Sequence, residues 1–322
     1  MAPIPVPQAL LDFIREGTRF IVAGHKEPDG DCVGSQLALT SALSRMGKTA
    51  IPCSAGPFKR PEIVSFEKDF IQILPDDLKH GTRVLIMDCS SPERTGSLAP
   101  FLEGIPTATI DHHATGHPYG DVFFLDPFAP SVTFMTLAVI EALGLEPTRH
   151  EAELLFFGLC TDTGFFRHVD DQGGAVFEYA ARMVHAGASP KAAFQAINGG
   201  KSLDSRILLG LILARSTAYF EGKLIVSYEL LEDTERYGLQ GRDSDNLYQL
   251  LQSVVGVEAV VIIRQETPDN CTVGLRSREG VDVSAIAAQF GGGGHKQASG
   301  FSFPGTIEPI RQQLLRAFNE VL

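Results

Sequence analysis

The sequence predicts an α/β protein: an N-terminal, doubly wound, mostly parallel sheet domain, followed by a smaller C-terminal α+β domain. Three observations support this fold class. In the first half, apolar runs typical of buried strands alternate with helical patterns, and parallel strands require such crossovers. Near residue 187 glycine and proline interrupt the pattern. At 322 residues the chain is long enough for two domains, each with its own core.

The elements of the first half follow from apolar periodicity and from the residues that end helices. Gly47 and Gly144 stand where two of the helices are expected to end. The predicted helices are residues 8–16, 31–46, 131–144, 148–160 and 175–186. The predicted strands are residues 19–24, 49–53, 83–88 and 107–110. We expect these elements to form a domain over residues 1–187.

A linker at residues 188–203, with a helix between its breaks, is predicted to lead into a second domain at residues 204–322. Its predicted helices are residues 204–216, 244–253, 283–290 and 307–320. Its predicted strands are residues 218–221, 223–229, 257–265 and 271–277. Four consecutive glycines, residues 291–294, are expected to form a loop. We expect the active site to lie in the cleft between the two domains.

The formal net charge of −12 argues against a broad basic surface for long nucleic acid. A small phosphorylated substrate stays compatible with it, because metal ions supply positive charge locally. No apolar run reaches the roughly eighteen residues of a membrane helix, and the N-terminus does not resemble a secretory signal. We therefore expect a cytoplasmic protein without membrane contact.

The five cysteines form no C-x-x-C pair, so the sequence indicates neither a disulfide framework nor a zinc ribbon. Cys32, Cys89 and Cys160 each lie within two residues of a carboxylate that we consider functional. We interpret them as small buried residues that fill strand ends and helix starts. Ligation of a soft metal ion is the alternative.

Three side chains suited to metal binding crowd one turn between a predicted strand and a predicted helix. His25, Asp29 and Asp31 follow the strand at residues 19–24 directly. Glycines in the same turn allow the backbone to come close to a ligand. Each of these side chains alone has an ordinary structural explanation, such as a core histidine or a helix cap. Their crowding at one turn favours a binding site.

Two further strand ends carry residues of the same kind. Asp88 ends one predicted strand, and Asp111, His112 and His113 follow the next. In open α/β sheets the ligand site lies outside the carboxyl ends of the strands. A later carboxylate, Asp162, follows the helix at residues 148–160. The sequence therefore predicts that all these side chains meet in one crevice.

Four carboxylates in one crevice would repel each other and raise each other's pKa unless cations were present. Two divalent ions would neutralise Asp29, Asp31, Asp88 and Asp162. Mixed oxygen and imidazole donors suit Mn²⁺ best, with Mg²⁺ next and Co²⁺ or Zn²⁺ as alternatives. A pair of such ions activates water and polarises phosphorus–oxygen bonds. The predicted reaction is metal-assisted phosphoester hydrolysis.

In this order, the site residues resemble the four motifs of the DHH phosphoesterases, and the C-terminal half resembles the DHH-associated domain. The second resemblance rests on Arg276-Ser277 and on the glycine run that ends in His295. The resemblance implies one metal ion held by His25, Asp29 and Asp88. It implies a second ion held by Asp31, Asp88, His112 and Asp162. It also implies that His113 faces the scissile phosphate and that Asp111 orients the histidines.

The DHH-associated domain is expected to recognise the substrate. Arg276 can bind a phosphate bidentately, the backbone of Gly293 and Gly294 can approach a nucleotide, and His295 can contact phosphate or ribose. Ser277, next to Arg276, is also expected to be a substrate-binding residue. A flexible connector is the alternative for the glycine run. Two aromatic residues after Asp162, at positions 165 and 166, are compatible with base stacking or with core packing.

Within the family the chain resembles the nanoRNase/pAp phosphatase group. That resemblance implies hydrolysis of short oligoribonucleotides to mononucleotides and of 3′-phosphoadenosine 5′-phosphate (pAp) to AMP. The alternative is a phosphodiesterase for cyclic di-AMP or its linear product pApA, and a further one is a non-catalytic nucleotide-binding module. The expected partners are short single-stranded RNA or a small nucleotide, without long duplex nucleic acid. Formation of a homodimer stays open.

Overall fold

The computed structural model describes residues 4–73, 80–89, 91–113, 119–171, 173–239 and 242–322. The chain divides into two compact units, Met1–Gly200 and Lys201–Leu322. No helix in these described ranges is both long and apolar enough to cross a membrane.

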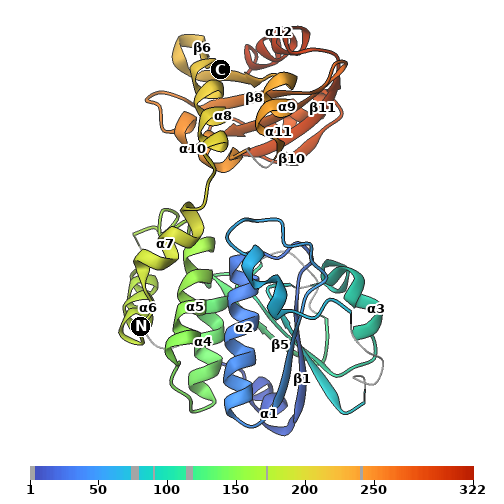
Figure 1. Cartoon of the computed structure of the whole chain (residues 1–322), viewed down its shortest axis with the longest axis vertical. Coiled ribbons are helices and arrows are strands. Elements are labelled where there is room, and N and C mark those ends of the chain that lie inside the picture. The colour runs from blue at the N-terminus through green and yellow to red at the C-terminus, as the bar shows by residue number, and fades with distance from the viewer. Residues whose placement is uncertain (1–3, 74–79, 90, 114–118, 172, 240–241) are drawn as a thin grey trace. The chain divides into compact units, whose positions relative to one another are not determined.

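The first unit is built on a five-stranded sheet in the order β2-β1-β3-β4-β5, and every neighbouring pair is parallel (Figure 1). The strands are β1 (Arg19–Gly24), β2 (Thr49–Cys53), β3 (Thr82–Met87), β4 (Thr107–Asp111) and β5 (Val122–Leu125). The predicted parallel sheet and four of its strands are confirmed. The prediction missed β5, a four-residue edge strand with only one buried side chain.

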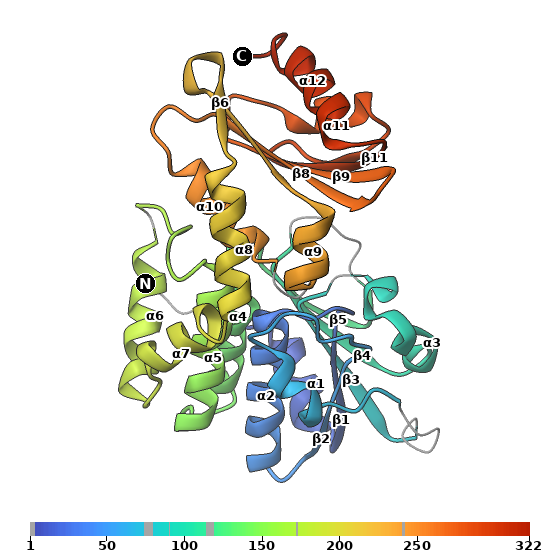
Figure 2. The same ribbon diagram turned by 45° about the horizontal axis from the view of Figure 1, so that its top comes forward.

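Helices cover both faces of this sheet (Figure 2). On one face, α1 (Gln8–Glu16), α2 (Gly30–Arg45) and α4 (Val132–Ala142) share an apolar core with β1, β3 and β4. On the other face, η3 (Pro92–Leu98) and α3 (Ala99–Leu102) supply Leu98 and Leu102. The helices α5 (Arg149–Asp162), α6 (Gly174–His185) and α7 (Pro190–Asn198) pack outside α2 and α4. A short helix, η1 (Val64–Asp69), follows β2.

Helices α2 and α5 lie unusually close because glycines face their contact. A Cβ atom at Gly34 would lie 2.6 Å from the carbonyl oxygen of Leu154. At the far end of the pair, the buried Glu151 accepts hydrogen bonds from Ser41 Oγ (2.8 Å) and from Arg45 Nε (3.0 Å). This packing sets the first turn of α2 beside the last turn of α5.

The second unit contains a six-stranded mixed sheet in the order β10-β11-β9-β8-β7-β6. Only its β7–β8 pair is parallel. The strands are β6 (Thr217–Tyr219), β7 (Leu224–Glu229), β8 (Ala259–Thr267), β9 (Asn270–Ser277), β10 (Gly293–His295) and β11 (Ala298–Pro304). The helical segments are α8 (Leu203–Ala214), η4 (Phe220–Gly222), α9 (Leu231–Tyr237), α10 (Ser244–Gln252), α11 (Val283–Gln289) and α12 (Ile307–Phe318).

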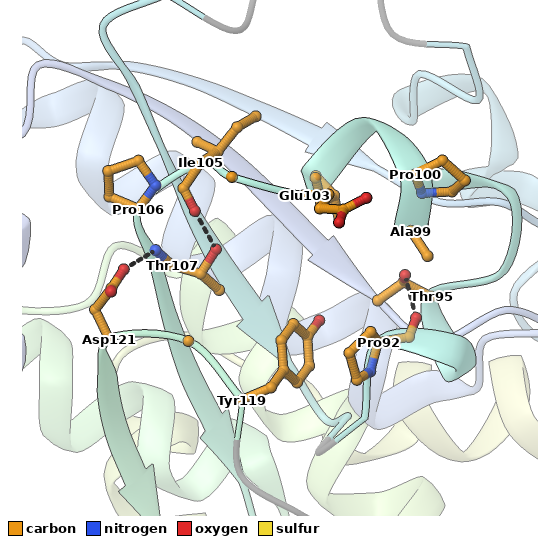
Figure 3. A pocket seen from close by; sticks show the side chains of 13 residues that line it. Pro92, Thr95, Ala99, Pro100, Glu103, Ile105, Pro106, Thr107, Tyr119 and Asp121 are labelled. Carbon is orange, nitrogen blue, oxygen red and sulfur yellow. Dashed lines mark hydrogen bonds between the residues drawn. The ribbon is translucent and has the colours of Figure 1, made fainter.

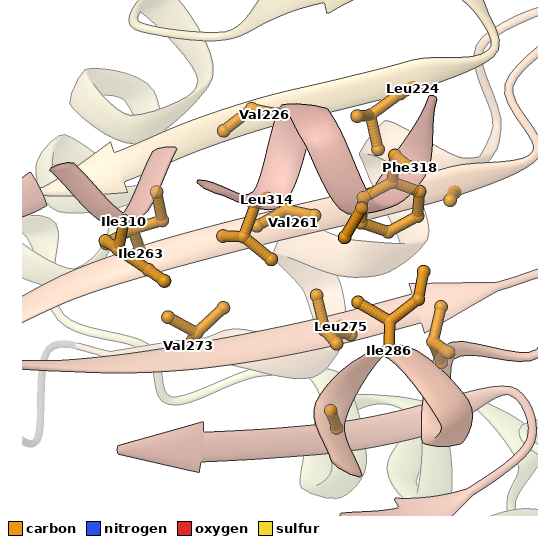
Figure 4. Close-up of a cluster of buried hydrophobic side chains, with 14 of the residues drawn as sticks. Leu224, Val226, Val261, Ile263, Val273, Leu275, Ile286, Ile310, Leu314 and Phe318 are labelled. Atoms are coloured by element: carbon orange, nitrogen blue, oxygen red, sulfur yellow. The ribbon is translucent and has the colours of Figure 1, made fainter. Parts of the chain in front are cut away.

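Figure 4 shows α11 and α12 packed on one face of this sheet, where Ile286, Leu314 and Phe318 meet the strand side chains. Helices α8 and α10 cover the other face. The prediction of a loop over the glycine run was wrong in part, because Gly293–His295 is a strand paired antiparallel with β11. Glycine is needed there, since a Cβ at Gly294 would lie 2.5 Å from the carbonyl oxygen of Ala298.

Candidate functional site

The turn between β1 and α2 presents three of the predicted site residues at one sheet edge. His25 follows the last residue of β1. Asp29 is the N-cap of α2 and accepts a hydrogen bond from the backbone N–H of Cys32 at 3.1 Å, as short polar side chains commonly do at this position. Asp31 lies in the first helical turn and is fully buried.

Two neighbouring segments fix this turn. The backbone N–H of Lys26 donates to the carbonyl oxygen of Arg94 in η3 at 2.6 Å. The backbone N–H of Glu27 donates to the carbonyl oxygen of Gly56 at 2.9 Å. At the surface, Glu27 also pairs with Lys59 from the same segment as Gly56 (2.5 Å). The turn is therefore fixed from both sides of β1.

Asp88 lies at the centre of the cluster. It directly follows β3, its backbone is left-handed with φ +58°, and only 2% of its surface is exposed. His25 Nε2 lies 3.5 Å from Asp88 Oδ2, and His112 Nε2 lies 3.6 Å from Asp88 Oδ1. A left-handed conformation is unfavourable for aspartate, and such conformations concentrate at functional sites.

Asp31 and Asp162 complete the cluster from the helical side. Asp162, the last residue of α5, lies with its Oδ2 3.3 Å from His112 Nε2. The two oxygens of Asp31 accept hydrogen bonds from the backbone N–H groups of Val132 (2.5 Å) and Thr133 (2.8 Å) at the start of α4. The close packing of α2 and α5 brings these two carboxylates to the same place.

Hydrogen bonds to backbone carbonyls orient both inner histidines. His25 Nδ1 lies 2.8 Å from the carbonyl oxygen of Lys26, and His112 Nδ1 lies 3.0 Å from that of Ala129. Because a carbonyl oxygen only accepts, each Nδ1 carries the proton, and in the neutral ring the Nε2 lone pair faces the carboxylates. Metal-binding histidines are held in this way.

Asp111 holds the third histidine. Its Oδ1 accepts hydrogen bonds from the backbone N–H groups of His112 (2.9 Å) and His113 (3.2 Å) and from His113 Nδ1 (2.7 Å). The hydrogen bond to Asp111 is the main cause that raises the pKa of His113. His113 is half-buried, with 34% of its side chain exposed, and its Nε2 is left for a ligand.

Burial and mutual repulsion raise the pKa of three carboxyl groups of the cluster. Burial, and after it the charge of Asp88, raises the pKa of Asp31 to about 7. Burial, followed by the charges of Asp31 and Asp88, raises the pKa of Asp162 to about 10. Burial also raises the pKa of Asp88, and its Oδ1 accepts no hydrogen bond in the described part of the chain. Divalent cations would let these groups ionise together, so the residues fit a metal site.

The donor atoms form three groups, and within each group all atoms lie within 4.8 Å of one another. The groups are His25 with Cys32 and Asp88; Asp88 with His112 and His113; and Asp31 with His112 and Asp162. Asp29 lies beside the first group, with its Oδ1 3.8 Å from His25 Nε2. All six side chains predicted as ligands thus converge, and Cys32 joins them.

The predicted residues of the second unit lie on neighbouring strands. Arg276 in β9 pairs with Ala298 in β11, which pairs in turn with His295 in β10. The guanidinium group of Arg276 lies over the ring of Tyr248, 4.6 Å from its centroid. His295 and the glycines before it, Gly293 and Gly294, are exposed. Arg276 and His295 therefore lie in register with Ala298, on the two strands that flank β11.

Ser277 is less accessible than its neighbours. Its side chain is buried, and its hydroxyl donates to the carbonyl oxygen of Val281 at 2.6 Å. Phe165 and Phe166, which also follow a predicted ligand, both have left-handed backbones with φ +56° and +70°. Phe165 packs against Phe194 (5.2 Å between ring centroids), and Phe165 and Phe166 border the helical core. The structure therefore favours the core-packing interpretation for this aromatic pair.

Sequence reasoning missed two arginines near the cluster. Arg60 and Arg94 lie on the two segments that hold the β1–α2 turn. Burial is the largest single influence on both carboxyl groups and raises the pKa of Asp162, but in Asp29 the hydrogen bond and charge of His25 outweigh it and lower the pKa below its usual value. The positive charge of Arg60 lowers the pKa of both groups. Arg94 acts in the same way on His113. Basic residues in a proline-rich loop are only a weak sequence signal, because spacing does not tie them to a distant turn.

A cavity of about 730 Å³ lies elsewhere in the first unit, beside the beginnings of β4 and β5 (Figure 3). Several of its polar groups make local hydrogen bonds. Thr107 Oγ1 donates to the carbonyl oxygen of Ile105 at 2.8 Å, the Thr107 backbone N–H donates to Asp121 Oδ2 at 2.9 Å, and Thr95 Oγ1 donates to the carbonyl oxygen of Pro92 at 2.6 Å. None of the predicted site residues lines it.

Comparison with known proteins finds two domain models that match this chain. Residues 19–159 match the DHH family, N-terminal domain, and residues 221–322 match the DHHA1 domain. Over 305 residues the chain is 30% identical to the bifunctional oligoribonuclease and PAP phosphatase NrnA of Thermus thermophilus, covering 92% of this chain and 90% of that protein.

Two further similarities are more distant in sequence. The chain is 22% identical to the cyclic-di-AMP phosphodiesterase GdpP of Geobacillus thermodenitrificans, over 98% of this chain but only 49% of that protein. A crystal structure of an exopolyphosphatase-related protein from Bacteroides fragilis has the same fold, with a TM-score of 0.83 at 21% identity. That match covers 98% of this chain and 96% of the other.

Proposed function

This chain belongs to the DHH family and carries its DHHA1 domain, and on that premise we propose that it is a two-metal phosphoesterase. Its substrates are short oligoribonucleotides, which it hydrolyses to mononucleotides, and pAp, which it hydrolyses to AMP. The observation that carries the proposal is the convergence of two oriented imidazole Nε2 atoms on three buried or partly buried carboxylates, those of Asp29, Asp88 and Asp162.

The ligands proposed for the first ion are His25, Asp29 and Asp88. Those proposed for the second ion are Asp31, Asp88, His112 and Asp162. Mixed oxygen and imidazole donors suit Mn²⁺, with Mg²⁺ or Co²⁺ as alternatives. Bound at this site, such ions polarise phosphoryl oxygens and activate water.

The protein's own groups would position the substrate. Asp111 holds His113 through Nδ1, which leaves Nε2 to bind an oxygen of the scissile phosphate or to protonate the leaving oxygen. Arg60 and Arg94 add positive charge on two sides of the turn. This charge would attract the second phosphate of pAp. These cations also offset the negative charge that an anionic substrate brings to an acidic protein.

The second unit is proposed to recognise the nucleotide. Arg276 would bind a phosphate, while Gly293, Gly294 and His295 would contact the nucleotide through backbone and ring. We propose that Ser277 supports this surface through its hydrogen bond to Val281. We propose residues 1–187 as the catalytic domain, 188–203 as the linker and 204–322 as the substrate domain.

Three broader features of the proposal concern partners and location. The charge of −12 fits a small substrate better than long duplex nucleic acid. All five cysteines are free and buried, which fits the reducing cytoplasm. A homodimer would be tested by light scattering.

One assay tests the reaction and its rival. Protein reconstituted with metal is given pAp, short RNA oligomers, pApA and cyclic di-AMP, and kcat/KM is compared. We expect pAp and short RNA to be preferred. Preference for cyclic di-AMP would support the activity that GdpP is named for, and tight nucleotide binding without turnover would support a regulatory module. Asp88→Ala should lose both ions and essentially all hydrolysis, and activity with intact metal content would refute the shared-ligand assignment.

A further inference from the structure

A fourth side chain stands among the donors proposed for the first ion. His25 Nε2 lies 3.5 Å from Asp88 Oδ2 and 3.8 Å from Asp29 Oδ1. Cys32 Sγ lies within 4.8 Å of the donor atoms of His25 and Asp88. With metal–ligand bonds of about 2.0–2.3 Å, neighbouring donors of a tetrahedral ion lie roughly 3.3–3.8 Å apart. His25 Nε2 already has this spacing to each of the two oxygens, and the sulfur lies within 4.8 Å of the same nitrogen.

We propose that Cys32 is a metal ligand, so that the first position is a His–Asp–Asp–Cys site that prefers Zn²⁺ or Co²⁺ to Mn²⁺ or Mg²⁺. Water or a phosphoryl oxygen would bind such an ion as a fifth ligand. The preference follows because thiolate is a soft donor. The second position keeps only oxygen and imidazole donors, so the two positions differ in metal preference. This inference rests on the proposed metal site and adds a ligand and a selectivity to it.

The fold directs the sulfur toward the cluster. Cys32 stands in the first turn of α2, and side chains of helices lean toward the N-terminus. A Cβ atom at Gly24 would lie 2.2 Å from Cys32 Sγ, so glycine at the end of β1 makes room for the sulfur. Cys32 is fully buried. Independently, Asp88, which belongs to the same donor group as Cys32, is buried, and its Oδ1 accepts no hydrogen bond in the described residues. This oxygen lies 3.6 Å from His112 Nε2 and 3.5 Å from His113 Nδ1, and it points to a cation bound by Asp88.

The sulfur also has a structural partner. Cys32 Sγ lies 3.4 Å from Gln36 Oε1, and Gln36 Nε2 donates to the carbonyl oxygens of Val22 and Cys53, each at 2.9 Å. In the metal-free protein the thiol donates to Gln36. On ion binding the S–H bond would break, its proton would pass to solvent, and a sulfur–metal bond would form. A ligand role therefore requires that the hydrogen bond to Gln36 be lost.

Cobalt titration distinguishes a Cys32 that binds metal from a Cys32 that only donates a hydrogen bond to Gln36. Metal-free protein is titrated with Co²⁺, and the near-ultraviolet absorption of thiolate-to-cobalt charge transfer is recorded. We expect this band in the wild type and in the control Cys53→Ser, whose sulfur is buried outside the described donor groups. We expect it to be absent in Cys32→Ser and Cys32→Ala, although elemental analysis finds Co²⁺ bound to both.

Metal competition provides a second readout. Cys32→Ser should bind Zn²⁺ about tenfold or more weakly than the wild type, with a much smaller change for Mn²⁺. Circular dichroism and thermal unfolding establish that the variants are folded, and serine keeps a donor for Gln36. An equal band in wild type and Cys32→Ser, or cobalt binding to wild type without the band, overturns the proposal.

The cobalt experiment and the hydrolysis assay can fail independently of each other. Nucleotide hydrolysis by a wild type that shows no sulfur band would refute the ligand role of Cys32 and leave the phosphoesterase intact. A sulfur band in a protein that hydrolyses none of the nucleotides would support the ligand and refute the reaction.

Discussion

Replacing Asp162 by asparagine should stabilise the metal-free protein while weakening its response to metal. With only 20% of its side chain exposed, Asp162 has a pKa raised to about 10 by burial and by Asp31 and Asp88, against an ordinary value of 3.8. At pH 7 the native state must therefore hold a proton that the unfolded state has released. One pKa unit is about 1.4 kcal/mol, so this costs at most about 4 kcal/mol.

The direction of the pKa shift of Asp162 determines how the stability of the metal-free protein changes with pH. A carboxyl group with a raised native pKa favours the native state fully below its unfolded pKa, and this contribution is lost as pH rises toward the native pKa. Metal-free wild type should therefore lose stability between pH 4 and pH 8 more steeply than Asp162→Asn. Asparagine has nearly the same shape and carries no charge, so the comparison isolates electrostatics.

Urea unfolding at pH 7 in the presence of a chelator measures the effect. We expect the free energy of unfolding of Asp162→Asn to exceed that of the wild type by about 1–4 kcal/mol. The free energy of unfolding of the exposed control Asp69→Asn should stay within about 0.5 kcal/mol of the wild-type value. Added Mn²⁺ should then stabilise the wild type far more than Asp162→Asn. If Asp162→Asn is no more stable than the wild type without metal, the carboxylate repulsion inferred here is wrong.

Three other changes test the substrate contacts and the helix packing. Arg276→Ala should raise KM for dinucleotides about tenfold or more with a smaller change in kcat; an unchanged KM would exclude this arginine from binding. Arg60→Gln should raise KM for pAp more than Lys59→Gln, because Lys59 is paired with Glu27, and equal effects would refute the distinction. Gly34→Ala should lose about 1–3 kcal/mol of unfolding free energy and weaken metal binding, and wild-type values for both would contradict the close-packing argument.

The sheet of the first unit could be predicted because its inner strands are continuous apolar runs. Strands β1, β3 and β4 are buried on both faces, which makes their sequences unambiguous. Strand β5 lies at the sheet edge and exposes most of its side chains, so it lacks that pattern. Strand β11 (Ala298–Pro304) includes glycine, proline and two serines, residues that usually indicate a loop.

Much of the site could also be predicted, because parallel strands bring their carboxyl ends to one edge. This rule placed His25, Asp88 and His112 together without knowledge of the tertiary structure. It left metal ligation by Cys32 only as an alternative, because the position of this sulfur beside the cluster depends on the space left by Gly24. Nor did it reveal Arg60, because the contact between its loop and the β1–α2 turn is a tertiary backbone hydrogen bond.

The two hydrogen bonds from the start of α4 to Asp31 would link binding of the proposed metal ions to one helix. Each oxygen of Asp31 already accepts one backbone N–H, from Val132 or Thr133, so an ion would share a carboxylate that caps this helix. The amide protons of these two residues therefore become reporters of occupancy. Their chemical shifts and exchange rates would follow metal titration directly, even in a protein that has no substrate to turn over. The same link makes the segment before α4 a place where sequence changes could tune metal affinity without touching a ligand.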